Sequence, residues 1–574
     1  MRAASRRGLF RVHAWIGLNL GLLLFVICFS GTVAVFSAEL SWLADPGLRV
    51  APPANGDERR PLSWQGMHDA VAAAHPHGRI VSLHAPDGDG FAAIALLAYA
   101  ADDHRIALVN PYTGRVQGHR SSVTLSGILR IFHKQLYLVP TVAGWHGTLA
   151  VGALGLPLLL AAITGIVSVR RWWRALVTVR TGRSARLFWS DMHRATGLWS
   201  LLIALLLCIT GLWYFAEIVM ERTKLLPDEP RAARVSAETM RQMPADLLPL
   251  DLDRAVALAQ TAYPALTIMQ VRLPVRPGDA LVMTGPAEAW LSRERANAVQ
   301  MNPYTGDILQ IHRAIDLDAF PRWVEMADPL HFGTFAGLTS RILWFVAGLL
   351  LSGGILAGLY GAWLRLRQNT VLPPQTRLIA IVVVLPTLGL LLAAMYGSWA
   401  YSGGFMRQAQ RTIQIVTLAQ PVLGARQTTL YWIDPAATRA DGVMTVSLRF
   451  AGAAQPNLRQ VRLWLDDTPQ GEPALLLSDR ATARLTLPTG RCADGCRLQL
   501  VIEDWDGLRQ QAVLPLRLDD PALLQGAAPM PAAETMGAGS KAVLAIFVLC
   551  LLLPVWGWVV LQWRLNGARP ASRT

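Results

Sequence analysis

Two apolar stretches of the chain begin in the same way, 180 residues apart. His13 lies four residues before Gly17, and His193 lies four residues before Gly197; each motif leads into a long apolar run. The same separation links three further pairs: Cys28 with Cys208, Ser30 with Thr210, and Gly31 with Gly211. Chance rarely preserves one spacing at four chemically similar pairs, so the pattern indicates an internal duplication.

Two further repeated features, later in the chain, extend the duplication. The turn sequence Asn-Pro-Tyr-Thr-Gly occurs at 110–114 and again at 302–306, and His133 is matched by His331. Each copy therefore carries one histidine before its first apolar run and another before its second. A fold for this chain has to place these four histidines at matching depths.

The apolar runs are long enough to cross a membrane. A helix needs roughly 20 apolar residues to span the hydrocarbon core, and 52% of the residues are hydrophobic whereas only 16% are charged. Six stretches meet that length: about 14–37, 145–169, 195–218, 341–364, 377–399 and 541–563. The first stretch is too long for a signal peptide and lacks a convincing cleavage site, so we expect it to remain as a span.

Basic residues set the expected orientation. Arginine clusters lie at 2–11, 170–186, 365–377 and 564–573, and alternating spans bring all of them to one side. By the positive-inside rule that side is cytoplasmic, with both termini inside. The same placement explains the net charge of +14, which would otherwise suggest nucleic acid. We therefore expect a multi-pass protein in the lipid bilayer of a bacterial inner membrane, with three long segments in the periplasm.

The expected fold class is an α-helical polytopic membrane protein with about six spans and a duplicated unit, carrying two periplasmic α+β modules and a periplasmic β-sandwich. The expected domains are span one to residue 37, a periplasmic module at 38–144, span two at 145–169, a basic cytoplasmic loop at 170–194, span three at 195–218, a second module at 219–340, span four at 341–364, span five at 377–399, the β-sandwich at 400–540, span six at 541–563 and a cytoplasmic tail at 564–574.

The two modules show the same order of elements. The first is expected to form a helix at 62–74 and strands at 79–85, 91–99 and 105–110. The second is expected to form a helix at 251–263 and strands at 267–273, 280–284 and 297–302. In both Asn-Pro-Tyr-Thr-Gly turns, Asn and Pro start the chain reversal and Gly supplies the positive φ that ends it.

Segment 400–540 lies outside the duplication. Five apolar or alternating runs separated by turns are typical of a small β-sandwich, at 443–450, 460–465, 483–487, 497–503 and 511–518. Cys492 and Cys496 flank a turn-like Ala-Asp-Gly, and a local disulfide and two free thiols are equally open. Cys28, Cys208 and Cys550 lie in apolar helices, where we expect them to pack as small hydrophobic residues.

Four histidines are candidates for metal ligands. His13 and His193 lie near the cytoplasmic ends of spans one and three, and His133 and His331 precede the periplasmic ends of spans two and four. An ionisable residue at a membrane edge is a functional hypothesis by default. Two imidazoles approaching from opposite sides suit six-coordinate haem iron, whose flat ring packs well between helices. The pattern thus predicts two b-type haems, which are non-covalent because Cys-x-x-Cys-His is absent.

Two alternatives to this ligand set stay open. A single interfacial histidine commonly caps a helix or extends to the headgroups, and only the pairing by duplication and by depth favours ligands. His146, at the start of span two, competes with His133 as the ligand of the periplasmic haem.

Further histidines of the modules have two interpretations each. His75 and His77 would point the same way on a strand and suit a metal site, or they are solvated surface residues. The dipeptides His119-Arg120 and His312-Arg313 follow the two repeated turns. They face an anionic substrate over the periplasmic haem, or they are polar loop residues.

Several motifs together resemble the PepSY-associated transmembrane helix family. They are His13-x-x-x-Gly before span one, Asp191-x-His-Arg-x-x-Gly-Leu-Trp at span three, Pro329-Leu-His-Phe-Gly-x-Phe-x-Gly-Leu before span four, and the two repeated turns. The resemblance covers about residues 1–370 and implies that the two modules are PepSY-like. It also implies that His13, His193, His133 and His331 ligate haem iron. Members resemble iron-regulated inner-membrane proteins, some of which are haem-containing reductases that release iron from ferric siderophores in the periplasm.

The function expected from these features is transmembrane electron transfer. Electrons would enter at the His13/His193 haem, pass to the His133/His331 haem and reduce a ferric siderophore or another periplasmic acceptor. No dinucleotide fingerprint, P-loop or His-Glu-x-x-His motif is present, so the donor is a quinol or a separate cytoplasmic reductase. The alternative is a non-enzymatic, membrane-anchored scaffold that binds a periplasmic peptide or protein. A repeat-based transporter fits less well, because the duplication is parallel and no charge lies mid-span.

Overall fold

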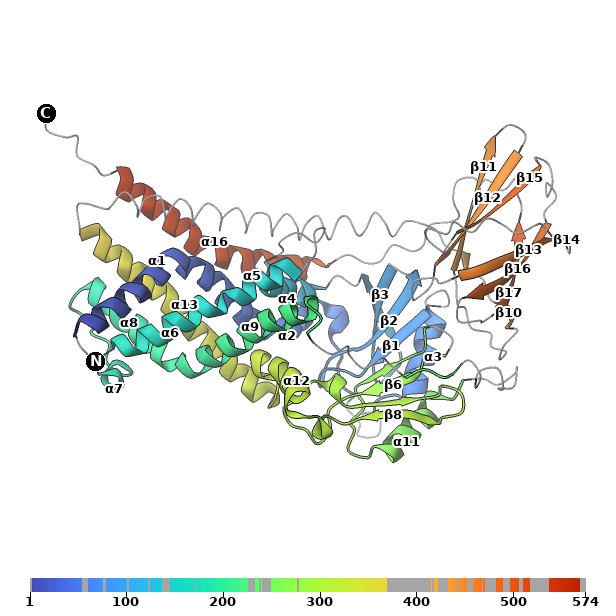
Figure 1. Ribbon diagram of the computed structural model, residues 1–574, viewed down its shortest axis with the longest axis horizontal. Helices are drawn as coiled ribbons and strands as arrows, with labels where there is room; N and C mark the ends of the chain where they lie inside the picture. The colour runs from blue at the N-terminus through green and yellow to red at the C-terminus, as the bar shows by residue number, and fades with distance from the viewer. Residues whose placement is uncertain are drawn as a thin grey trace.

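The computed structural model describes residues 3–368 apart from short gaps, the strands between 414 and 516, and residues 536–567. The gaps within 3–368 are 54–59, 76–78, 101–102, 122–123, 137–144, 170, 226–232, 237–238, 240–248 and 276–277. Figure 1 shows a bundle of long helices at one end of the molecule and β-structure at the other.

The bundle contains the apolar helices expected from the sequence. They are α1 (Ala3–Ala34), α5 (Trp145–Ala153) with α6 (Gly155–Ser168), α9 (Leu201–Arg222), α13 (Gly337–Gln368) and α16 (Ala538–Gly567). Within the described residues, four helices are long and apolar enough to cross a membrane: Arg7–Ala34, Gly147–Ser168, Leu201–Arg222 and Gly337–Arg365. Apolar side chains such as Leu156, Leu202 and Leu343 are more than half exposed, which suits a surface that faces lipid.

Four predicted spans therefore have a matching helix, and the remaining two differ in status. The fifth, at 377–399, lies outside the described residues. The sixth falls within α16, whose described apolar part, Ala538–Pro554, is shorter than a full span.

The start of the third span was predicted too early. His193 lies on α8 (Ala185–Trp199), which ends before Ser200, and the apolar α9 begins at Leu201. The α8 sequence carries several charged residues, so it forms an amphipathic helix against α13 rather than the first turns of a membrane span. A short turn of helix, α7 (Trp172–Ala175), precedes it.

Three shorter helices lie where the bundle meets the β-structure. They are α2 (Ser37–Ala44), α4 (Leu125–Gln135) and α12 (Ala319–Phe332). In α4 the buried residues Leu125, Ile128, Leu129 and Phe132 follow the three- and four-residue spacing of one helix face. That face packs with Leu22, Phe25 and Val26 of α1, so α4 is fixed to the first span.

The two predicted modules share a single sheet. Its strands are β1 (Arg79–His84), β2 (Ala93–Ala100), β3 (Asp103–Val109), β4 (Val116–Ser121), β5 (Gln270–Arg272), β6 (Leu281–Thr284), β7 (Ala298–Met301) and β8 (Ile308–His312), in the order β4-β3-β2-β1-β5-β6-β7-β8. Every neighbouring pair is antiparallel, and β1 joins β5 with Leu83 opposite Val271. The predicted helices and the first three strands of each module agree with these ranges within about three residues, whereas β4 and β8 were not predicted.

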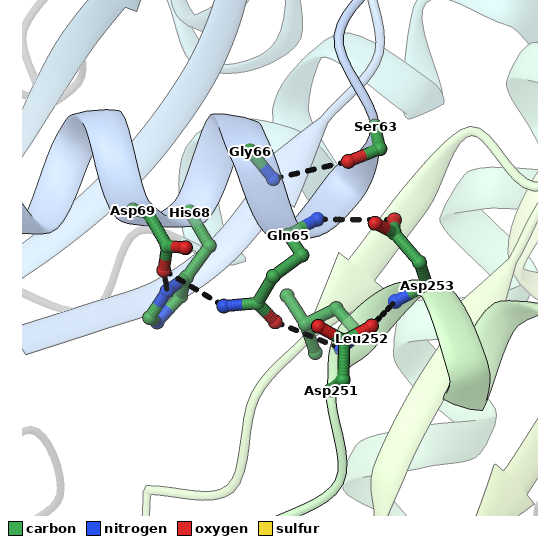
Figure 2. A network of polar contacts seen from close by, with 8 residues as sticks. All are labelled: Ser63, Gln65, Gly66, His68, Asp69, Asp251, Leu252 and Asp253. Atoms are coloured by element: carbon green, nitrogen blue, oxygen red, sulfur yellow. Dashed lines mark hydrogen bonds and ion pairs between the residues drawn. The ribbon is translucent and has the colours of Figure 1, made fainter.

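The helices α3 (Trp64–Ala74) and α11 (Leu252–Ala262) belong to one core with the sheet. Figure 2 shows how their N-termini are joined. The amide N–H of Gln65 donates to Asp253 at 3.1 Å, and the N–H of Leu252 donates to the Gln65 side chain at 2.8 Å. Ser63 and Asp251 cap the two helices. N–H groups that would stay unsatisfied at each helix start thus bind the other repeat.

The repeated turns have the predicted chemistry. The Asn110 side chain accepts the N–H of Tyr112 at 2.9 Å, and Asn302 does the same for Tyr304 at 3.1 Å. Gly114 and Gly306 adopt φ values of 73° and 80°, where an L side chain would be strained. Short 3-10 helices at Pro46–Leu48, Glu294–Ala296 and Ala314–Asp316 complete this part of the chain.

The C-terminal segment contains two antiparallel sheets. The first has the order β10-β17-β16-β13-β14 and the second β15-β12-β11-β9. Their strands are β9 (Gln414–Ile415), β10 (Leu418–Pro421), β11 (Trp432–Ala440), β12 (Val443–Ala451), β13 (Leu458–Leu465), β14 (Thr468–Pro469), β15 (Thr482–Pro488), β16 (Cys496–Asp504) and β17 (Arg509–Leu516). Cys496 is disulfide-bonded, whereas Cys492, its partner in one of the two alternatives left open by the sequence, lies outside the described residues.

Candidate functional site

The four candidate histidines meet in two pairs inside the helical bundle. His13 of α1 lies beside His193 of α8, with 5.8 Å between the ring centroids. His133 of α4 lies beside His331 of α12, with 6.1 Å between centroids. We call these the inner pair and the outer pair. Each pair takes one histidine from each repeat, as the duplication predicted.

The inner pair is held by carbonyl groups of the neighbouring spans. His13 Nδ1 donates to the carbonyl of Ala161 on α6 at 2.9 Å. His193 Nδ1 donates to the carbonyl of Gly354 on α13 at 2.7 Å. The two rings therefore use equivalent helices of the two repeats. In both rings the nitrogen that makes this hydrogen bond is Nδ1 rather than Nε2.

The outer pair is held in a related way. His133 Nδ1 donates to the carbonyl of Ile27 on α1 at 3.1 Å and lies 3.3 Å from the Ser30 hydroxyl. His331 Nδ1 lies 2.7 Å from the Thr210 hydroxyl on α9. Because that hydroxyl donates its own hydrogen to the Leu206 carbonyl at 2.9 Å, it is the acceptor for His331.

These contacts assign the same tautomer to all four rings. A carbonyl can only accept, and the Thr210 hydroxyl hydrogen is already used, so each Nδ1 carries the proton. The lone pair then lies on Nε2, the atom that ligates a metal when Nδ1–H is bound to an oxygen. The donor chemistry of both pairs is therefore that of two neutral imidazole ligands.

Glycines behind the rings were not singled out as site residues from the sequence. A Cβ added to Gly358 would lie 2.7 Å from His193, one added to Gly165 would lie 3.2 Å from His13, and one added to Gly31 would lie 2.7 Å from His133. Each of these glycines lies four residues after the residue whose carbonyl binds the ring. The sequence feature that could have identified these glycines is their position about one helical turn after the residue whose carbonyl accepts from the ring, on the same helix face.

The two pairs lie far apart along the bundle. His13 and Ile27, which contacts His133, are both on α1 and are separated by 14 residues. At about 1.5 Å of rise per residue, the pairs are roughly 21 Å apart along this helix. That separation is about two thirds of the thickness of a hydrocarbon core, which is about 30 Å.

A buried carboxylate lies on the same helix as His193 of the inner pair. Asp191, two residues before His193, accepts from the Arg180 side chain at 2.8 and 2.9 Å and also pairs with Arg194. The hydrogen bonds from Arg180 lower the pKa of Asp191 to about 2, although burial opposes this shift. The loop before α8 is thereby tied to the helix that carries His193.

The remaining histidines differ from the expectations in several respects. His146 lies on α5, and its side chain is outside the described residues. His75 is the C-cap of α3 rather than a strand residue, and its ring lies 4.6 Å from that of His119; His77 is outside the described residues. Among the residues that the structure describes, no three His, Cys, Asp or Glu side chains are grouped to hold a metal ion.

Three of the four residues in the two His-Arg dipeptides lie in strands, and Arg313 directly follows a strand. His119 and Arg120 lie in β4, and Arg120 makes a two-point ion pair with Asp45 at 2.9 and 3.0 Å. His312 ends β8, and Arg313 pairs with Glu288 at 3.0 Å and stacks over Tyr263. Each arginine therefore pairs with a carboxylate of its own module.

The chain was compared with known proteins. It is 29% identical over 266 residues to uncharacterized protein PA4219 of Pseudomonas aeruginosa, an alignment that covers 42% of this chain and 64% of that protein. The model of the PepSY-associated TM region family matches residues 10–365, which include both histidine pairs, nearly all of the four apolar spans and the eight-stranded sheet. The chain thus belongs to the PepSY-associated transmembrane region family.

Proposed function

We propose that this protein is a di-haem electron-transfer protein of the bacterial inner membrane that reduces a periplasmic acceptor. The observation that carries the proposal is the meeting of four histidines in two pairs, each ring with Nδ1 bound to an oxygen. Each pair would hold one non-covalent b-type haem, which supplies one-electron chemistry when bound.

The spacing of the rings supports this proposal. A bond of about 2 Å from each imidazole nitrogen separates the centroids of two rings on one metal by roughly 6 Å. The centroids lie 5.8 Å apart in the inner pair and 6.1 Å apart in the outer pair. Hydrogen bonds from Nδ1 to carbonyl oxygens fix the ring orientation and raise the basicity of the ligand nitrogen.

The direction of transfer follows from the orientation proposed for the chain. Arg180 and Arg183 lie in the loop before α8 and Arg186 lies in its first turn, on the side of the inner pair, which makes that side cytoplasmic by the positive-inside rule. The disulfide of Cys496 suits an oxidising compartment for the C-terminal sheets. Electrons would pass from a quinol or a cytoplasmic reductase to the inner pair, then to the outer pair and the periplasm.

The acceptor that we propose is a ferric siderophore. One electron converts its Fe(III) to Fe(II), and the lower charge weakens binding by hard oxygen ligands. This choice rests on the resemblance to iron-regulated members of the family, whereas the electron path rests on the histidines.

The proposal is tested by the absorption spectrum of the detergent-purified protein, before and after reduction by dithionite, with haem counted per chain. We expect two haems per chain and one in each of the variants His193→Ala and His331→Ala. His133→Ala should also lose one haem, and His68→Ala, outside both pairs, should lose none. A chain that stays colourless after expression with ample haem contradicts the proposal and favours a membrane-anchored scaffold for a periplasmic partner.

The acceptor is tested separately with the reduced protein. A ferric siderophore should reoxidise it, whereas the same siderophore loaded with Ga(III), which cannot accept an electron here, should not. Reoxidation by neither complex would exclude siderophore iron as the acceptor and leave the di-haem proposal intact.

A further inference from the structure

A tyrosine of the third span connects the outer pair to a carboxylate. The Tyr214 ring lies edge-on to the His331 ring, with 5.2 Å between centroids. Its hydroxyl donates to Oδ1 of Asp328 at 2.7 Å. Asp328 precedes His331 by three residues on α12, so both lie on one face of that helix.

The carboxylate is paired with an arginine from the sheet. Arg293 lies in the connection between β6 and β7, and its Nη1 is 3.3 Å from Oδ2 of Asp328. The same guanidinium contacts Glu325 of α12, with 3.1 Å between Nε and Oε2. The side chains of Arg293, Glu325 and Asp328 are mostly shielded from water. Their electrostatic interactions are therefore screened less, and extend further, than those of surface ion pairs.

A proline fixes this arginine to the helix. Pro329 has no N–H, so the carbonyl of Glu325, four residues earlier, loses its helical partner. The backbone N–H of Arg293 donates to that carbonyl at 3.2 Å, and its side chain donates to the Val324 carbonyl at 2.6 Å. The β6–β7 connection is therefore joined to α12 beside the outer pair.

The arrangement occurs in the second repeat alone. By the spacing that matches His133 to His331, Arg130 corresponds to Asp328 and Ile131 to Pro329. By the spacing that matches Gly31 to Gly211, Ala34 corresponds to Tyr214. The duplication therefore does not explain these residues, and the charge at the position three residues before the ligand is opposite in the two repeats.

We propose that Asp328 and Arg293 set the reduction potential of the outer centre with opposite signs, and that Tyr214 holds this ion pair against His331. The inference rests on the proposed haem function. A carboxylate stabilises the more positive, oxidised state of a nearby iron centre, and a guanidinium opposes it. Asp328 thus lowers the potential of the outer centre and Arg293 offsets that effect, which makes both of them positioning and tuning residues rather than ligands.

The test is a spectroelectrochemical titration of the full chain and of two variants that keep side-chain shape. At the wild-type midpoint of the outer centre, Asp328→Asn should raise the ratio of reduced to oxidised haem at least threefold. Arg293→Gln should lower the same ratio at least threefold, and Arg293→Lys should restore most of it. The inner centre should not change in any of them.

Arg313→Gln is the matched control, because Arg313 also pairs with a glutamate of the second module but does not contact the outer pair. Shifts of the same sign in Asp328→Asn and Arg293→Gln, or shifts no larger than the control, would assign the ion pair a purely structural role and overturn the inference. A wild-type chain without haem would instead refute the proposed function itself, so the two failures are distinguishable.

Discussion

The inner and outer histidine pairs meet the same chemical need by different means. Both inner rings bind carbonyls of the second span of their own repeat, at Ala161 and Gly354. In the outer pair, His133 uses the Ile27 carbonyl whereas His331 uses the Thr210 hydroxyl. The requirement that survived duplication is therefore an acceptor for Nδ1, and the group that supplies it was free to change.

The surroundings of the pairs differ more than the pairs themselves. The helix that carries His193 of the inner pair also carries Asp191, which pairs with two arginines close by in the sequence. Behind the outer pair, the charged partner Arg293 comes from the β6–β7 connection, far from α12 in the chain. The outer pair is thus the one whose environment depends on the folding of the sheet.

The largest effect is expected where a methyl group would occupy the space of a ring. Gly358→Ala places a Cβ 2.7 Å from His193 and should remove the inner haem alone, leaving one haem per chain. Gly31→Ala does the same to His133 and should remove the outer haem alone. The strain of such overpacking is about 1–3 kcal/mol, which is enough to displace a ring from its ligand position.

Gly211 supplies the control for both variants. It matches Gly31 in the second repeat, yet a Cβ built on it meets no atom within 4 Å, because His331 binds the Thr210 hydroxyl instead of a carbonyl. Gly211→Ala should therefore keep two haems. Loss of haem from Gly211→Ala, or its retention in Gly31→Ala, would show that the glycines do not act through the rings.

A smaller effect is expected at the acceptors of the outer pair. Thr210→Val removes the acceptor of His331 while keeping the side-chain shape, and loss of such a partner typically costs 10–100-fold in metal affinity. Ser30→Ala, the matched change in the first repeat, should cost less than about threefold, because the Ile27 carbonyl still accepts from His133. Retention of haem during transfer to apomyoglobin measures the haem affinity of both variants. Equal losses of affinity in Thr210→Val and Ser30→Ala would contradict the proposed difference between the two acceptors.

The sequence predicted the histidine pairs because the internal duplication repeats the spacing of these histidines. The repeated spacing placed His13 with His193 and His133 with His331, and hydropathy located the helices around them. The last residues of helix α8 were included in the predicted third span because the residues after Leu198 are apolar except for Ser200, which separates α8 from α9.

Three other features depend on contacts that no local pattern encodes. The β1–β5 pairing joins segments nearly 190 residues apart, so the modules were expected as separate units. Strand β4 contains Gly118, His119 and Arg120 in place of alternating apolar residues, so its sequence does not indicate a strand. The link from Tyr214 through Asp328 to Arg293 needs three elements at once, and no single one of them is distinctive in sequence.

The smallest expected effect concerns the first module and its dependence on pH. Burial, together with the nearby charges of His75, Arg105 and Arg120, lowers the pKa of His119 to about 4 from its ordinary 6.5. Arg120 is itself paired with Asp45, which limits its contribution. The folded state disfavours the protonated His119 ring. The contribution of the neutral ring to the free energy of unfolding is therefore complete above pH 6.5 and is lost as the pH falls from 6.5 toward 4.

Hydrogen exchange of the full-length protein across that range measures this loss. Protection of β3 and β4 should fall relative to β7 and β8, which serve as the reference within the same sheet. His119→Gln should flatten the difference, because glutamine does not titrate and the unfolded chain then takes up no extra proton at this position. Equal pH dependence in the two repeats, or no change in His119→Gln, would mean that the strands of the first module respond to acid through another group.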